Sequence, residues 1–489
     1  MSQKQPRTAS SSLHVHVIFV HLDLGIGGAE QLVLQLAESS IACGHSIELV
    51  TTNCQPTHCF ASVKPPNGPL YPFLRIHGNW IPQDIAGKFR TLCSTLRLLY
   101  LTYWLARRPT AFKNTLIVLD VLPTPLPFLS YLAPTLFYCH FPDLLLKRDA
   151  NQTTTPSSSS PSLAKSWYRT VLNGLEEHTM SYGDVLVVNS LFTKSVVQQT
   201  FPKLQDLHVL YPALKPNDDN NNTKNKDSID RQYMIVSLNR YERKKNLELV
   251  LYAVDWMRSQ KDGKQIALPH IVIAGGYDRT NVENVEYRAE LQHLADTLSL
   301  KVDFRQSISD EERATLLSTC AAVLYTPANE HFGIVPLEAM QAGTPVIALN
   351  SGGPKETILS GKTGFLCDNT AASVGQAVKQ ILQDFPDLSN RLGQAGKEHV
   401  LTTFGADRMV QEWQRLTQLA LQRGHERQRN TKYQVVSLRN MILLLETFVV
   451  FVLVLCLTAL LRCTGLLGHD ESIAGSIKRL TGLQPTGEL

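Results

Sequence analysis

The sequence predicts an α/β protein with two doubly wound, Rossmann-like domains that face each other across a cleft. The chain has 489 residues, which exceeds one ordinary hydrophobic core and favours more than one domain. Short β-branched and apolar runs alternate with stretches of helical period, which is typical of parallel sheets with crossover helices. The alternation stops at residues 215–231, where Asn, Asp and Lys dominate, and then restarts. This stretch is predicted to be the linker or loop between the two domains.

The N-terminal domain is expected at residues 13–214, after a polar tail at 1–12. The elements predicted in order are a strand at 14–21, a Gly-rich loop at 22–28, a helix at 29–42, and strands at 46–52, 115–119, 135–139 and 184–189. A stretch rich in Thr, Ser and Pro, residues 151–161, is interpreted as a loop insert within this domain.

The C-terminal domain is expected at residues 232–424, with a final helix that can cross back to the N-terminal domain. Its strands are predicted at residues 233–238, 271–274, 302–304, 323–325 and 345–349. In sheets of this kind, ligands bind at the carboxyl ends of the strands. The motifs that directly follow a strand are therefore the candidate functional residues.

Two carboxylates, Glu330 and Glu338, flank a short loop between an apolar strand and a helix-forming run at 337–342. The first is expected on the loop and the second in the first turn of the helix, where Pro336 suits the first helical position. A helix start favours anions, because its first N–H groups lack partners and the macrodipole is positive there. A diphosphate can lie over this loop while both carboxylates accept hydrogen bonds from sugar hydroxyls. The loop residues expected at the nucleotide sugar are Phe332, Gly333, Ile334 and Val335.

Two glycines, Gly27 and Gly28, lie between the first strand and its helix. They permit close approach of a ligand to the backbone, and their N–H groups together with the helix dipole can stabilise a leaving diphosphate. A tight strand-to-helix turn is the alternative interpretation.

A cluster of cations follows the strand at 233–238, in a run that begins with Arg240 and includes Lys245. Fixed cations can stabilise the negative charge that develops on a departing phosphate, so that no metal ion is needed. A basic surface turn is the alternative.

One histidine, His140, directly follows the apolar strand at 135–139. In this architecture a side chain at that position faces the cleft. A lone histidine is more often structural than catalytic, and that alternative stays open.

Composition excludes several classes of protein. A formal net charge of +4 is too small to indicate nucleic-acid binding. Nine cysteines, an odd number scattered from Cys43 to Cys463, do not form the pattern of a secreted disulfide framework. Cys54, His58 and Cys59 come nearest to a zinc cluster, but no second pair completes it. No Asp-x-Asp motif occurs, and no metal site is predicted.

Two apolar stretches indicate contact with a membrane. Residues 447–461 are uncharged but shorter than the ~20 residues of a straight span, and extending them to 441 includes Glu446. A tail anchor within 425–489, with its basic side cytosolic, and a shallow re-entrant helix both stay open. Residues 92–106 form either a helix lying in the membrane interface or a buried helix of the N-terminal domain. No signal peptide precedes the first strand, so the catalytic part is expected to be cytosolic.

Four runs resemble those of retaining glycosyltransferases of the glycogen-synthase-like, GT-B superfamily. They are Gly27-Gly28-Ala29-Glu30, Phe-Tyr-Cys-His-Phe-Pro-Asp at 137–143, residues 240–246, and residues 330–340. The run around His140 is the most specific, and it resembles the endoplasmic-reticulum mannosyltransferases that extend the dolichol-linked core oligosaccharide. The resemblance covers the chain from the first strand to about residue 424. The inserts at 151–161 and 215–231 depart from the compact pattern of that family.

The resemblance implies a metal-independent transfer of mannose from GDP-mannose, without a cofactor, to a dolichol-diphosphate chitobiose that bears one mannose. Successive α-1,3 and α-1,6 linkages would form in N-glycan precursor assembly, on the cytosolic face of the endoplasmic reticulum membrane. Other early glycosyltransferases of the pathway are possible partners.

The resemblance also implies a role for each site residue. Glu330 contacts the hexose, Glu338 binds the ribose, and Arg240 and Lys245 hold the diphosphate, while His140 lies beside the transferred sugar. The leaving phosphate takes the acceptor proton, so Glu330 orients the hexose rather than acting as a base. As a further hypothesis, Lys147 and Arg148 bind the diphosphate of the acceptor.

Two other functions stay open. One is a GT-B transferase with a different lipid-linked or soluble acceptor, against which the apolar stretches and the run at 137–143 argue. The other is a catalytically inactive membrane scaffold, which should lack one of four residues that this chain retains: Glu330, Glu338, Arg240 and Lys245. A phosphorylase is disfavoured, because no lysine suited to carry pyridoxal phosphate is recognisable.

Overall fold

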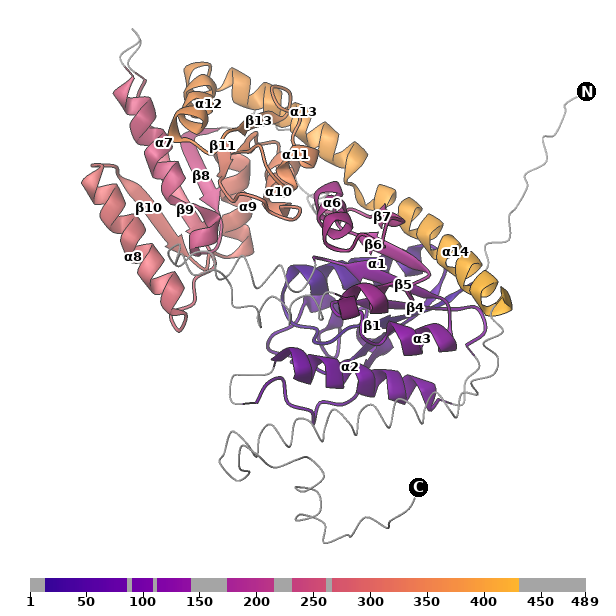
Figure 1. The fold of residues 1–489 in the computed structure, drawn as a ribbon. Helices are drawn as coiled ribbons and strands as arrows, with labels where there is room; N and C mark the ends of the chain where they lie inside the picture. The colour runs from indigo at the N-terminus through magenta and orange to yellow at the C-terminus, as the bar shows by residue number, and fades with distance from the viewer. Residues whose placement is uncertain are drawn as a thin grey trace, which may run out of the picture.

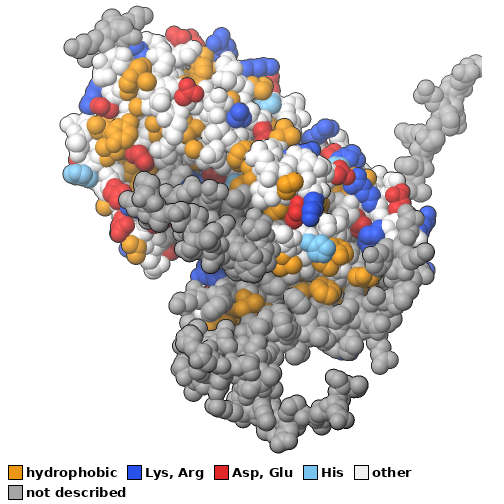
Figure 2. All heavy atoms as spheres, viewed as in Figure 1, with side chains coloured by type: hydrophobic (Ala, Val, Ile, Leu, Met, Phe, Trp, Pro, Cys, Tyr) orange, Lys and Arg blue, Asp and Glu red, His pale blue; other side chains and the backbone are white. Residues whose placement is uncertain are grey.

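The computed structural model describes residues 14–85, 90–108, 112–141, 174–214, 231–260 and 266–430. These residues form two bodies, each built on a parallel β-sheet with helices on both faces (Figure 1). The predicted pair of Rossmann-like sheets is confirmed. Basic and acidic side chains are intermixed over the described residues on the face shown in Figure 2.

The N-terminal sheet has seven strands, all paired in parallel. In spatial order they are β3 (Leu74–Ile76), β2 (Ser46–Thr51), β1 (His16–Val20), β4 (Thr115–Asp120), β5 (Thr135–Cys139), β6 (Val185–Val188) and β7 (Leu207–Val209). One face packs against α1 (Gly28–Ala42) and α14 (Ala406–Asn430). The other packs against α2 (Arg90–Ala106), α3 (Leu126–Leu132) and α6 (Leu191–Thr200).

The C-terminal sheet has six strands, also parallel. In spatial order they are β10 (Val302–Gln306), β9 (His270–Gly275), β8 (Gln232–Leu238), β11 (Cys320–Tyr325), β12 (Val346–Leu349) and β13 (Gly364–Cys367). The helices α7 (Glu248–Ser259), α8 (Val282–Thr297) and α12 (Ala371–Gln383) cover one face, and α9 (Asp310–Thr319) and α10 (Ile334–Gln341) cover the other. The other elements of the described residues are α11 (Pro354–Thr357), α13 (Asp387–Thr403) and the 3-10 turns η1 (Ala61–Val63), η2 (Tyr71–Phe73) and η4 (Arg243–Lys245).

The order of strands reverses between β1 and β4 in the first sheet and between β8 and β11 in the second. Ligands of open α/β sheets bind in the crevice at such a switch point, outside the carboxyl ends of the strands. The loops after these four strands therefore mark where a substrate is expected. They carry the glycine loop, the basic cluster and the Glu330 loop, and His140 follows the neighbouring strand β5.

The last described helix, α14, begins beside the C-terminal body and runs along the N-terminal one (Figure 1). Trp413 of α14 is fully buried in the N-terminal core, where its ring stacks on Phe19 with centroids 6.0 Å apart. Trp413 Nε1 also donates a hydrogen bond of 2.8 Å to Ser40 Oγ of α1. Because these contacts are buried, α14 is part of the N-terminal core as well as the end of the C-terminal body.

Helix α2 corresponds to the apolar stretch for which two interpretations were open. Leu98, Leu101 and Leu105 are fully buried and belong to the core between α2 and the sheet. On the face of α2 that carries these leucines, the structure favours a buried helix of the N-terminal body over a helix lying in the membrane interface. None of the helices in the described residues is both long enough and apolar enough to cross a membrane. The apolar stretch at 441–461 lies outside the described residues.

Candidate functional site

The loop that carries Glu330 follows β11 and is supported by two glycines. Gly353 N donates to Glu330 O at 2.8 Å, and a Cβ at Gly353 would lie 2.2 Å from Phe332 O. Gly352 has a φ of +62° and approaches the Glu330 backbone equally closely. Such distances exclude a side chain at either glycine, so the Gly352-Gly353 pair fixes where Glu330 stands.

Lys245 pairs with Glu330, and their Nζ and Oε2 atoms are 2.6 Å apart. The lysine ends η4 after β8 and is 8% exposed, while Thr326 Oγ1 donates to its backbone carbonyl at 2.8 Å. Burial alone would raise the pKa of Glu330, but the adjacent Lys245 ammonium lowers it below its usual value. The structure therefore brings together an ionised carboxylate and a buried cation that sequence reasoning had placed in separate motifs.

Helix α10 starts earlier than predicted. Gly333 is its N-cap, with a φ of +79°, and Ile334 is its first residue. Glu338 therefore lies in the second turn rather than the first, and Pro336 is the third helical residue rather than the first, so both expectations were wrong. The left-handed conformation of Gly333 turns the chain directly into the helix. The N–H groups of Ile334 and Val335 then belong to the helix start, where anions are favoured.

Glu338 contacts the guanidinium of Arg313 through Oε2. Burial raises the pKa of Glu338 above its usual value, and Arg313 only partly offsets this effect. Arg313 lies on α9 and was not singled out in the sequence.

Arg240 is exposed and pairs with a neighbour rather than with Glu330. Its Nη1 lies 2.9 Å from Glu242 Oε1, and its side chain is 62% exposed. Lys244 pairs with the same carboxylate at 3.1 Å, and Arg243 pairs with Glu290. The basic run thus separates into one buried lysine and three side chains at the surface, because η4 turns Lys245 inward.

His140 lies at the carboxyl end of β5 and contacts a carboxylate that the sequence analysis missed. Its Nε2 is 3.1 Å from Asp120 Oδ2, at the end of β4. The Asp120 carboxylate also binds His21 Nδ1, which follows β1, at 2.8 and 2.9 Å. Asp120 and His21 are both polar residues at the carboxyl end of an apolar strand. The rule that selected His140 would have found them if it had been applied to every strand end.

Burial and the two histidines act in opposite directions on Asp120. Burial alone would raise the pKa of Asp120, but His21 and His140 lower it to about 2. Burial lowers the pKa of His21, whereas Asp120 raises it, and the net pKa is above the usual value. The electrostatic surroundings therefore favour the imidazolium form of His21, paired with the ionised Asp120 carboxylate.

The glycine loop leads into α1, whose first residue is Gly28 and whose N-cap is Gly27. A Cβ added at Gly28 would meet no described atom within 4 Å, and one at Gly27 would meet the flexible side chain of Glu30. Packing among the described residues therefore does not require glycine at either position. The base of the loop is fixed by Asp23, whose carboxylate is held by both Nη atoms of the buried Arg97.

Two contacts join the His140 side of the site to the Glu330 side. The rings of Phe141 and His331, the residues that follow His140 and Glu330, stack with centroids 3.7 Å apart. Ser190 Oγ donates to His331 O at 2.6 Å. The loops that carry the candidate residues of the two bodies therefore meet.

In the described part of the chain, no group of three or more His, Cys, Asp or Glu side chains is arranged to hold a metal ion. The hypothetical acceptor-binding residues Lys147 and Arg148 lie outside the described residues.

Comparison with known proteins agrees with this architecture. The family model "Glycosyl transferases group 1" matches residues 218–399. Sucrose-phosphate synthase from Thermosynechococcus elongatus has a similar fold, with a TM-score of 0.62 at 20% identity, over 83% of this chain and 98% of that structure.

Two relatives are similar over most of their length. Alpha-1,3/1,6-mannosyltransferase ALG2 of Homo sapiens is 37% identical over 434 residues, which cover 84% of this chain and 98% of the human protein. The protein of the same name from Dictyostelium discoideum is 36% identical over 418 residues, or 80% of this chain and 94% of its own. The chain therefore belongs to the alpha-1,3/1,6-mannosyltransferase family that these relatives represent.

Proposed function

We propose that this protein transfers mannose from GDP-mannose to a dolichol-diphosphate chitobiose bearing one mannose. Two successive transfers form one α-1,3 and one α-1,6 linkage, in either order. The observation that carries the proposal is that the loop with the Lys245–Glu330 pair meets the loop with His140, through the stacking of Phe141 on His331. Membership of the mannosyltransferase family supports mannose as the sugar.

The donor diphosphate lies over the start of α10, within reach of Lys245. Cleavage of the sugar–phosphate bond places negative charge on the departing phosphate, and a fixed cation stabilises that charge more strongly than it stabilises the substrate. Lys245 has three N–H donors, so it can keep Glu330 while it binds a phosphate oxygen. Arg240, exposed and flexible, exchanges Glu242 for the diphosphate. With these cations in place, the reaction needs no metal ion.

The two carboxylates bind the sugars at either end of the diphosphate. Glu330 is ionised and accepts hydrogen bonds from mannose hydroxyls, while Glu338 accepts them from the ribose. His140 binds a hydroxyl beside the anomeric carbon. The acceptor attacks from the face that the nucleotide leaves, and the phosphate takes its proton, so that the anomeric configuration is retained.

The protein is further proposed to work on the cytosolic face of the endoplasmic reticulum membrane. The apolar stretch at about 441–461, preceded by basic residues from 423 to 439, would anchor the chain there as a tail anchor or a re-entrant helix. This anchor would hold the cleft near a lipid-linked acceptor.

Product analysis tests the proposal. The full-length protein is incubated with GDP-mannose, a short-chain analogue of the acceptor with one mannose, and EDTA. Two added mannoses, one removed by an α-1,3-specific and one by an α-1,6-specific mannosidase, are expected. Lys244→Ala serves as a matched control for Lys245→Ala, because Lys244 is a half-exposed neighbour that pairs with Glu242 rather than with Glu330. Binding of GDP-mannose without transfer to this acceptor would reject the proposed acceptor, and dependence on a divalent cation would reject the metal-free reaction.

A further inference from the structure

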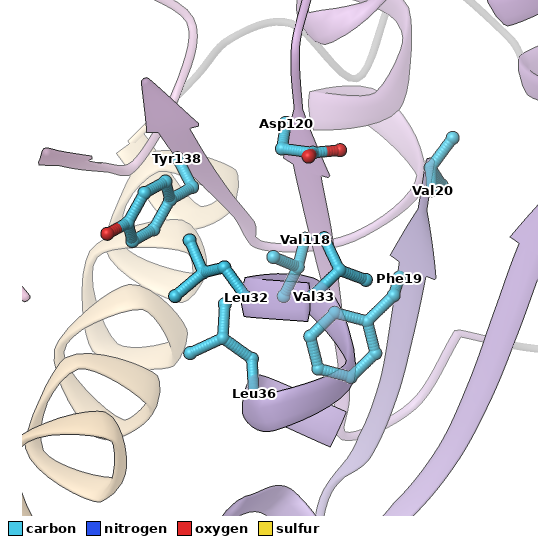
Figure 3. Close-up of a pocket in the computed structure, with 8 residues that line it drawn as sticks. All are labelled: Phe19, Val20, Leu32, Val33, Leu36, Val118, Asp120 and Tyr138. Carbon is cyan, nitrogen blue, oxygen red and sulfur yellow. The ribbon is translucent and has the colours of Figure 1, made fainter. Parts of the chain in front are cut away.

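Asp120 is a fully buried carboxylate above an apolar layer. It is 2% exposed, and the side chains beneath it come from β1, α1, β4 and β5 (Figure 3). Together with Asp120, these described side chains leave no room for a water molecule between them. A buried charge is costly unless it is paired, so the partners of Asp120 determine whether the site is stable. In the described residues its hydrogen-bond partners are His21 and His140.

The hydrogen bonds of His21 define its protonation state. Its Nδ1 lies 2.8 and 2.9 Å from the Asp120 oxygens, and its Nε2 lies 2.9 Å from Asp23 O. A carboxylate and a carbonyl can only accept, so both ring nitrogens must donate. His21 is therefore an imidazolium, and its positive charge balances the negative charge of Asp120.

The same reasoning fixes the tautomer of His140. Its Nε2 lies 3.1 Å from Asp120 Oδ2 and must also donate a hydrogen. Since His21 already balances the carboxylate, His140 can remain neutral, with its proton on Nε2 and a lone pair on Nδ1. The His140 side chain is 24% exposed, and the next residue, Phe141, stacks on His331 of the C-terminal body.

The backbone at Asp120 also favours a functional role. Val121 has a φ of +69°, which is strained for a β-branched residue, and Leu122 N donates to Asp120 O at 2.9 Å to close a tight turn. Such strain concentrates at functional sites, where the surrounding structure holds it in place.

We propose that Asp120 and His21 are positioning residues that hold His140 as its Nε2–H tautomer, so that Nδ1 accepts a hydrogen bond from a substrate hydroxyl in the cleft. The inference rests on the proposed function, because a substrate hydroxyl must enter the cleft for Nδ1 to act. Other charged and titratable groups lie around His21, Asp120 and His140. The negative charge of Glu30 on α1 raises the pKa of His21, and Asp23, which accepts from His21 through its carbonyl, pairs with Arg97. Tyr138 of β5 lies beside Asp120.

The kinetic test compares Asp120→Asn and His21→Gln with wild type in the full-length protein. An asparagine can donate to His140 and thereby favour the opposite tautomer. We expect kcat to fall about 100-fold in Asp120→Asn, the scale of a lost proton-positioning group, while KM for GDP-mannose changes less than about two-fold. His21→Gln, which leaves the carboxylate without a balancing charge, should lower kcat in the same way.

Asp184→Asn is the matched control. Asp184 is also a buried carboxylate of the N-terminal body, but it lies at the amino end of β6, whereas Asp120 lies at the carboxyl end of β4, and it pairs with Arg427. Its loss should lower stability and leave kcat close to wild type. Unchanged kcat in folded Asp120→Asn, or an equal loss of kcat in Asp184→Asn, would overturn the inference.

A second measurement does not depend on turnover. In protein labelled with ¹⁵N-histidine, the ring-nitrogen shifts of His140 and His21, assigned with His140→Gln and His21→Gln, report their protons. We expect His21 to be doubly protonated at pH 7 and His140 to carry its proton on Nε2. A proton on Nδ1 of His140 would reject the inference. If the wild-type enzyme formed no product, the proposed function would fail while the NMR result still decided the tautomer.

Discussion

Lys245 and Glu330 form an ion pair, with Nζ 2.6 Å from Oε2. The lysine is almost fully buried and the carboxylate stands on a loop that two glycines hold in place. Each charge offsets the cost of burying the other. Donor binding therefore meets a cation that is already in position, and a change at either residue should affect both binding and chemistry.

The first prediction concerns Lys245→Ala. The variant loses the cation that stabilises the leaving phosphate, and we expect kcat to fall about 100- to 1000-fold, as for loss of one fixed transition-state donor. Steady-state kinetics with GDP-mannose measure this change, and Lys244→Ala should stay near wild type.

The same variant should change its pH dependence. Burial raises the pKa of Glu330 and Lys245 lowers it most, so without the lysine the effect of burial is opposed only by the weaker influences of His331 and Lys244, and the pKa should rise. If Glu330 must be ionised, the residual activity of Lys245→Ala should appear at higher pH than that of wild type. A profile with an unshifted acid limb would argue against a role for ionised Glu330.

The second prediction concerns Glu338→Ala. A hydrogen bond to the ribose exists in the ground state and in the transition state alike, so its loss should raise KM for GDP-mannose more than it lowers kcat. About a 10- to 100-fold rise is expected for a charged hydrogen bond. Glu312→Ala, which removes an exposed carboxylate that pairs with Arg305, is the control. A loss confined to kcat would contradict a ribose contact.

The third prediction concerns Glu356, which joins the two bodies. Its carboxylate accepts hydrogen bonds from Leu191 N at 2.7 Å, Phe192 N at 2.6 Å and Tyr211 OH at 2.9 Å. The two N–H groups belong to the first turn of α6, where a negative charge is stabilising. We expect Glu356→Ala to lower the free energy of unfolding by ~2 kcal/mol.

Urea denaturation measures this loss. Tyr211→Phe should cost less, because the backbone contacts persist, and Lys355→Ala, at an exposed neighbouring position, should cost little. Equal losses for Glu356→Ala and Lys355→Ala would show that the bridge between the bodies does not contribute.

The fourth prediction concerns stability in acid. Burial raises the pKa of Glu48, but hydrogen bonds from Arg108 outweigh it and, with His16, lower the folded-state pKa to about 2 from an ordinary 4.5. This group therefore stabilises the fold above pH 4.5, and the contribution is lost as the pH falls toward 2. The loss is on the order of 3 kcal/mol.

Glu48→Gln tests the source of this dependence. The variant should be less stable than wild type at pH 6, and the difference should shrink as the pH falls toward 3. Unfolding by urea at several pH values measures it, and a difference that stays constant would exclude Glu48 as the source.

The central strands were predictable because they are buried on both faces and read as continuous apolar runs, as in β4 and β5. The edge strands β3, β7 and β13 were not predicted, since they have only three or four residues and are partly exposed. The local sequence could not identify these strands, because they are defined by hydrogen bonding to the adjacent strand of the sheet.

The site was predictable as a set of strand-end motifs, but not as a set of contacts. The sequence motif predicts the same role for Arg240 and Lys245. In the structure, η4 buries the lysine and leaves the arginine at the surface. Asp120 and His21 are 99 positions apart, and only the parallel pairing of β1 with β4 brings them together. Long-range pairing of this kind leaves no signal in local sequence.

The burial of Trp413 in the N-terminal core has a consequence for synthesis on the ribosome. Chains emerge from their N-terminus and domains generally fold as units during translation. Here the first sheet lacks one of its covering helices, α14, until residues from 406 onward have been made. The apolar face of α1 and its sheet that α14 will cover therefore stays exposed while the entire second sheet is translated. Nascent chains halted before α14 should consequently depend on chaperones far more than chains halted after it.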